Sequence, residues 1–159
     1  YYQAKKQNKK VKGLLILAPG DDYSIEKHEK GKDFTKAVQY AKKLVKLGKG
    51  DQILPPHISK YSAKRFLSFA DSKNTESKLL NYSGELKLFS KVKEPMLAVF
   101  GSEDEYLVGT ASNSLAKLRE KTNSNFLETI IVPKANHGFK GKEKKLAKLI
   151  FDFIKFIDV

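Results

Sequence analysis

The sequence predicts an α/β fold in which a mostly parallel sheet is flanked by helices. Continuous apolar runs occur at 14–18 and 96–100, and runs of this length suit strands that are buried on both faces of a parallel sheet. A shorter apolar run at 130–132 ends a third predicted strand, 127–132. Apolar residues at helical spacing follow the second and third runs. Strand and helix therefore alternate over 96–157, which is the order of a sheet whose strands are joined by helical crossovers.

Composition restricts the classes of protein that this chain can belong to. It has 159 residues, of which 40% are hydrophobic, so it can bury the core of one domain. It contains no cysteine, and we expect neither a disulfide framework nor a thiolate metal site. No apolar run has the length of a membrane span, and the first ten residues are polar and basic rather than leader-like. We expect a cytoplasmic protein that has no membrane partner.

The net charge of +13 raises the possibility of nucleic-acid binding. Only Arg65 and Arg119 are arginines, and the other basic residues are lysines spread along the chain. Recognition of bases and phosphates favours the planar arginine fork. The pattern indicates a solvated lysine-rich surface, and we expect no nucleic-acid partner.

The N-terminal third combines one strand with helical segments. Residues 1–10 are typical of the end of a helix, and the strand 14–18 stops at Pro19-Gly20. Residues 23–32 are charged and lack periodicity, which predicts a loop. Apolar residues recur at helical spacing over 34–47, which predicts an amphipathic helix.

Two side chains are candidates for helix caps in the middle of the chain. Asp33 precedes the helix 34–47, and Ser62 precedes a short amphipathic segment. The whole stretch 21–90 lacks strand patterns, so we expect it to be a helical insert, or cap, on the sheet.

Residues 91–159 have the most regular pattern in the chain. It predicts a strand at 96–100, a helix at about 110–122, a strand at 127–132 and a last helix at about 142–157. The last helix has a broad apolar stripe with lysines opposite.

An acid and a histidine follow the two strands of this last segment. Asp104 comes after strand 96–100, and His137 comes after strand 127–132. A crossover connection makes such strands parallel, and neighbouring strands lie about 4.8 Å apart, so both loops open at the same sheet edge. A carboxylate that accepts Nδ1–H fixes the imidazole tautomer and leaves Nε2 free as a general base.

The residues around this pair carry a family resemblance. Residues 93–105 form a proline-led apolar run ending in Gly-x-x-Asp, and they resemble the acid-bearing strand of the α/β-hydrolase superfamily. Residues 136–139, followed by an amphipathic helix, resemble its catalytic-histidine loop, and 11–20 resembles the strand after its nucleophile helix. Segments 48–51, 54–55 and 62–68 are similar to the insert of a little-characterised serine-hydrolase family that includes fungal siderophore esterases. In that family the acid loop also reads Asp-Glu-Tyr, as it does here from Asp104.

The resemblance implies a specific chemistry for the chain. Asp104 would be the acid and His137 the base of a Ser-His-Asp triad that hydrolyses an ester or related acyl bond, with no metal or organic cofactor. The superfamily's nucleophile lies in a Gly-x-Ser-x-Gly elbow, and this chain has none. We expect the serine upstream, so that residues 1–159 are a partial α/β-hydrolase domain. Its expected partners are a small acyl substrate and either the missing N-terminal half or a second copy.

Several alternatives remain open at this point. Asp21 or Asp22, at the end of the first strand, is a second candidate for the triad acid. His57 could line a substrate cleft, although a loop role is the simpler interpretation. The three histidines have no metal-ligand spacing, and we expect Glu103 and Glu105 to face solvent. A catalytically inactive binding or interaction module of the same fold is the alternative function.

Overall fold

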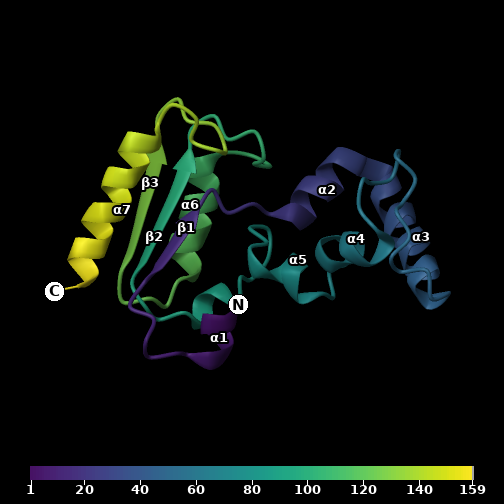
Figure 1. Cartoon of the computed structure of the whole chain (residues 1–159), viewed down its shortest axis with the longest axis horizontal. Coiled ribbons are helices and arrows are strands. Elements are labelled where there is room, and N and C mark those ends of the chain that lie inside the picture. The colour runs from purple at the N-terminus through teal and green to yellow at the C-terminus, as the bar shows by residue number, and fades with distance from the viewer. Residues whose placement is uncertain (159) are drawn as a thin grey trace. The chain divides into compact units, whose positions relative to one another are not determined.

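The structure, a computed structural model, describes residues 1–158 and contains two compact units (Figure 1). The first, here called the sheet unit, joins Tyr1–Gly20 to the chain from Glu85 onward. The second, the helical unit, is Asp21–Gly84. The predicted insert at 21–90 therefore ends a few residues earlier than expected.

The sheet unit is built on three parallel strands, which confirms the predicted α/β class. The strands are β1 (Leu14–Leu17), β2 (Met96–Gly101) and β3 (Leu127–Val132), in the order β1-β2-β3. Met96 is in register with Leu14 on one side and with Leu127 on the other. The strand β2 is thus the centre of the described sheet, and its neighbours are the first and third strands in chain order.

The three strands differ in burial. All six residues of β2 are buried, as its apolar run predicted. The strand β1 alternates instead, and Leu15 and Leu17 are 41% and 40% exposed. The prediction that 14–18 is buried on both faces is therefore wrong for this part of the chain. The physical reason is that β1 lies at the edge of the described sheet, where one face of the strand is left uncovered.

Helices cover both faces of the central strand. Figure 1 shows α6 (Ala111–Lys121) and α7 (Glu143–Ile157) on opposite sides of the strands. Phe153 of α7 packs in a cluster with Leu97 and Val99, which alternate along β2 with the residues of its other face. Both helices match their predicted ranges to within one residue at each end.

Two short elements complete the sheet unit. The helix α1 covers Tyr2–Lys6, so the predicted helical end at 1–10 is shorter than expected and stops at Gln7 in a left-handed conformation. The 3₁₀ turn η2 covers Phe89–Lys91 and leads towards β2.

The helical unit contains four α-helices and a 3₁₀ turn. They are α2 (Asp22–Lys30), η1 (Gly31–Asp33), α3 (Phe34–Lys46), α4 (Ala63–Ala70) and α5 (Thr75–Leu79). Its core consists of aromatic and aliphatic side chains from α3, α4 and the loop between them: Phe34, Ala37, Ala41, Leu44, Leu54, Ala63, Phe66, Leu67, Phe69 and Ala70. Extended pairing among its described residues is limited to one isolated bridge between Ile53 and Ser62, so the expected absence of sheet strands is confirmed.

The predicted loop at 23–32 is wrong, because most of it is the helix α2. None of the residues of α2 is buried, so no apolar periodicity marks this helix in the sequence. Its stability comes from polar contacts. Asp21 Oδ1 accepts a hydrogen bond from the Ser24 amide at 2.9 Å, and Lys30 pairs with Glu26 one turn earlier.

The two predicted caps have different outcomes. Ser62 Oγ accepts a hydrogen bond from the Arg65 amide at 3.3 Å, which confirms it as the cap of α4. Asp33 makes no capping hydrogen bond and has helical backbone angles. The turn η1 already leads into α3, so Asp33 is not in the extended conformation that a cap requires. Among residues 1–158, no helix combines the length and the apolar character that a membrane span requires.

Candidate functional site

The loops that follow β2 and β3 are hydrogen-bonded to each other. The Ser102 amide donates to the Val132 carbonyl at 3.0 Å, and the Glu103 amide donates to the Ala135 carbonyl at 2.9 Å. Ser102 Oγ accepts from the Lys134 amide at 2.8 Å. These bonds extend the pairing of the two strands into the loops and set the position of each loop against the other.

Gly101 permits this close approach. A Cβ atom at this position would lie 2.1 Å from the Ala135 carbonyl oxygen, which is far inside van der Waals contact. Only glycine allows the two chains to come this near. The glycine between the strand and the acid loop is therefore required by packing against the histidine loop.

The predicted meeting of Asp104 and His137 is confirmed. His137 Nδ1 lies 3.0 Å from Asp104 Oδ1. The Asp104 side chain is 1% exposed and that of His137 is 36% exposed. An ionised carboxylate only accepts hydrogen bonds, so we assign the proton to Nδ1, and Nε2 then has a free lone pair. The arrangement provides a partly exposed base with a buried anion behind it.

The two carboxylate oxygens of Asp104 differ in their hydrogen bonds. Oδ1 also accepts a hydrogen bond from the Tyr106 amide at 3.0 Å. Oδ2 is buried and has no hydrogen-bond partner among residues 1–158. A buried carboxylate with one unpaired oxygen depends strongly on the contacts that it does make. The imidazole N–H and the Tyr106 amide therefore carry its stabilisation.

Glu105 has a role in the site that the sequence did not reveal. Glu105 is exposed, as expected, but its Oε2 accepts a hydrogen bond from the backbone amide of His137 at 3.0 Å. That hydrogen bond lowers the pKa of the Glu105 carboxyl group. No sequence pattern marks this contact, because it depends on the backbone path of both loops.

Tyr106 also contacts the histidine. Its ring lies edge-on to the His137 imidazole, with a centroid separation of 4.8 Å and an interplanar angle of 73°. This is a favourable arrangement for two rings, and it restricts the imidazole on a side that Asp104 does not reach. Three consecutive residues, Asp104, Glu105 and Tyr106, therefore hold one histidine.

The structure gives the second candidate acids other roles. Asp21 is 6% exposed, and its Oδ1 and Oδ2 accept hydrogen bonds from the amides of Ser24 and Tyr82, both within the helical unit. This carboxylate is used to join the start of α2 to a later loop. Asp22 is exposed in the first turn of α2. His57 is exposed and lines a cavity of the helical unit.

The site contains neither a described metal-binding cluster nor a free serine hydroxyl at Ser102. Among residues 1–158 there is no group of three or more His, Cys, Asp or Glu side chains that could hold a metal ion. The serine nearest in sequence to Asp104, Ser102, uses its hydroxyl oxygen to accept the Lys134 amide. Its position belongs to the pairing of the two loops.

One protein-family model matches almost the whole chain. The model described as "Protein of unknown function (DUF1749)" matches residues 1–158. The chain belongs to this family. No curated protein matches it. The match to DUF1749 includes both the sheet unit and the helical unit, so the insert is part of what defines this family. The description of the family names no activity.

Proposed function

We propose that Asp104 and His137 are the acid and the base of a Ser-His-Asp triad that hydrolyses an ester or a related acyl bond of a small molecule. The observation that carries the proposal is the 3.0 Å contact between His137 Nδ1 and the buried carboxylate of Asp104, at the ends of two parallel strands. The α/β-hydrolase resemblance of the two loops supports it. Residues 1–159 supply two of the three triad members, and the serine comes from outside them.

The chemistry follows from the tautomer that Asp104 imposes. His137 Nε2 removes the proton of the serine hydroxyl as its oxygen attacks the substrate carbonyl. The imidazolium, stabilised by Asp104, then gives that proton to the leaving alkoxide, and an acyl-serine remains. In the second half, His137 removes a proton from water, the hydroxide attacks the acyl group, and the proton returns to the serine. No cofactor takes part in this proposed sequence.

Glu105 and Tyr106 act as positioning residues in this scheme. Glu105 holds the backbone of His137, and Tyr106 restricts its ring. A base that is held before the substrate arrives has less freedom to lose in the transition state. The scheme needs neither a nucleic-acid nor a membrane partner, and we propose the cytoplasm as its location, in line with the absence of cysteine.

The test measures hydrolysis of p-nitrophenyl acetate and butyrate by the full-length gene product. We expect His137→Ala to abolish turnover. Asp104→Asn should lower kcat by roughly 10⁴-fold, because an amide favours the wrong imidazole tautomer. His28→Ala serves as the matched control, since His28 is exposed in the helical unit, and it should leave kcat unchanged.

Two results would count against the proposal. Turnover that survives His137→Ala would remove this histidine from the chemistry. A well-folded full-length protein that hydrolyses neither ester would favour the alternative, a non-catalytic binding or interaction module of the same fold.

A further inference from the structure

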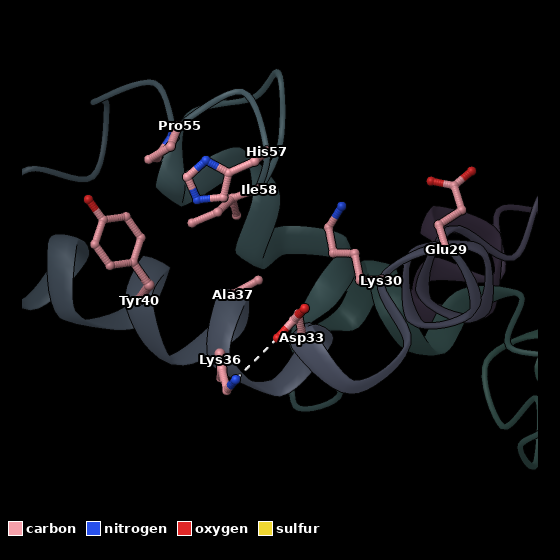
Figure 2. A pocket seen from close by; sticks show the side chains of 9 residues that line it. All are labelled: Glu29, Lys30, Asp33, Lys36, Ala37, Tyr40, Pro55, His57 and Ile58. Carbon is pink, nitrogen blue, oxygen red and sulfur yellow. Dashed lines mark hydrogen bonds and ion pairs between the residues drawn. The ribbon is translucent and has the colours of Figure 1, made fainter.

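The helical unit contains a cavity of about 940 Å³ that the proposed triad does not use (Figure 2). The last turn of α2, the first two turns of α3 and the loop at 55–58 line it. Cavities of this size hold organic ligands in other proteins. The side chains at its two ends determine which kind of ligand it can bind.

One end of the cavity is apolar and aromatic. Figure 2 shows the rings of Tyr40, on α3, and His57, on the loop, standing on opposite sides of the space. Ala37, which is 5% exposed, lies on α3 below His57 in this view, and Ile58 adjoins His57. Neither ring makes a ring contact or a side-chain hydrogen bond within residues 1–158. Two unengaged rings that face a common space can take a flat ligand between them.

The other end contains a partly buried cation. Lys30 Nζ lies 2.8 Å from Glu26 Oε2 and 5.8 Å from the centre of the Phe66 ring, and its side chain is only 16% exposed. Glu26 Oε2 accepts no hydrogen bond, so the contact with Lys30 is an ion pair without hydrogen-bond geometry. An ammonium group has three donors. In Figure 2 this ammonium lies between His57 and Glu29, and Lys30 lines the cavity, so a ligand in it could accept a hydrogen bond from the ammonium.

The remaining charges leave Lys30 as the deciding group. Asp33 and Lys36 neutralise each other at 3.2 Å, and both side chains are mostly exposed, so the pair contributes little. Glu29 is exposed and lies beyond Lys30, far from the two rings. The chain as a whole carries a net charge of +13, which attracts anions. Glu26 offsets the charge of Lys30, so the preference for an anionic ligand rests on the N–H donors that Lys30 has left and on the net charge of the chain.

The spacing along η1 and α3 sets the length of the ligand. Asp33, the last residue of η1, lies beside Lys30 in Figure 2. Tyr40 of α3 is seven residues further on, which corresponds to about 10 Å of helix. We infer that the cavity binds a flat aromatic carboxylate of about this length, with its rings between Tyr40 and His57 and its carboxylate on Lys30. The inference does not rest on the proposed hydrolase activity, because every residue in it belongs to the helical unit.

The test uses the full-length gene product and three probes that share one ring system. Naphthalene-2-carboxylate is anionic, naphthalene-2-methanol is neutral and 2-naphthylmethylammonium is cationic. Chemical-shift titration followed by NMR gives each Kd, and the shifted signals should include Tyr40 and His57. We expect a Kd on the order of 10⁻⁴ M for the carboxylate, and binding about tenfold weaker for the other two probes.

Variants separate the two ends of the cavity. Tyr40→Ala and His57→Ala should weaken the carboxylate and the alcohol alike, by roughly fivefold each. The double variant Glu26→Gln with Lys30→Gln removes both charges of the pair together, so no buried charge is left alone, and it should make carboxylate and alcohol bind equally. Lys46→Gln and Leu47→Ala, exposed residues at the end of α3, are the controls and should change nothing.

The outcomes are distinct. The inference is supported if the unaltered protein binds the carboxylate most tightly and only the Glu26–Lys30 double variant loses this preference. Tighter binding of the ammonium probe, equal binding of all three probes to the unaltered chain, or shifts confined to the sheet unit would overturn it.

Discussion

His137 is held by three contacts that act on different parts of the residue. Asp104 accepts from its ring at Nδ1, Glu105 accepts from its backbone amide, and Tyr106 packs against its ring. The contacts with Asp104 and Tyr106 set the tautomer and the orientation of the imidazole ring. The contact with Glu105 sets the position of the His137 backbone, and therefore of the ring attached to it. The consequence is that a residue outside the proposed triad can disturb the base without changing its chemistry.

Replacing Glu105 tests this role. Glu105→Ala should accelerate hydrogen exchange of the His137 amide by roughly threefold to tenfold, because the amide loses its acceptor. Glu105→Gln, whose carbonyl oxygen can still accept, should restore most of the protection. Glu103→Ala is the matched control, since Glu103 is the exposed acid on the other side of Asp104. Equal effects from Glu103→Ala and Glu105→Ala would contradict the assignment.

The same contact predicts a dependence on pH. The hydrogen bond from the His137 amide lowers the pKa of Glu105 relative to its ordinary value of 4.5. A carboxyl group with a lowered folded-state pKa stabilises the fold fully above its unfolded-state pKa and loses this contribution as the pH falls through the folded value. The ¹³C carboxyl signal of Glu105 should therefore titrate below pH 4.5, and in Glu105→Gln the His137 amide should lose less protection over that range. A midpoint above 4.5 would show that the contact does not persist in solution.

At the scale of single elements, burial determines which patterns are visible in the sequence. The helices α3, α6 and α7 bury one face and were predicted within two residues of their observed ends. The helix α2 buries no residue, so its sequence looks like a charged loop. Asp21 and the Glu26–Lys30 pair stabilise it instead. Apolar periodicity thus detects helices through what they pack against.

The two cap candidates provide a direct comparison. Ser62→Ala should lower the free energy of unfolding by about 1 kcal/mol, because the Arg65 amide loses its acceptor at the start of α4. Asp33→Ala should cost only a few tenths of a kcal/mol, roughly the value of an exposed ion pair. Urea unfolding followed by circular dichroism measures both. Equal losses would mean that Asp33 has a capping role that its hydrogen bonds do not show.

At the scale of the whole molecule, the edge strand β1 is the feature with the largest consequence for behaviour in solution. Leu15 and Leu17 are both about two-fifths exposed on β1, which pairs with β2 on one side only among the described residues. An apolar strand at a sheet edge is a site for pairing with other chains. The lysine-rich surface opposes such association through charge repulsion.

Leu17→Lys should therefore reduce self-association. Leu47→Lys adds the same charge at a residue that is 59% exposed near the end of α3, so it controls for repulsion alone. Sedimentation at about 0.15 M salt, where the Debye length is about 8 Å, should show a smaller associated fraction for Leu17→Lys than for Leu47→Lys. If the two variants behave alike, the edge of β1 is not the site of association.

The sequence alone determined the sheet and the meeting of the two loops. Apolar runs and helical spacing follow directly from burial, and a strand–helix–strand crossover brings the ends of its strands to one edge. Asp104 and His137 could therefore be paired without any structure, and Ser62 could be assigned as a cap. Their catalytic role stays a proposal.

Tertiary structure alone decided the contacts that depend on loop backbone. The hydrogen bond between Glu105 and the His137 amide requires the register in which Gly101 lies against Ala135. Likewise, the two oxygens of Asp21 join α2 to Tyr82, sixty-one residues away, rather than serving the sheet edge. Such contacts leave no periodicity in the sequence, because each is made by one side chain with one distant amide. Their positions are known only once both backbones are in place.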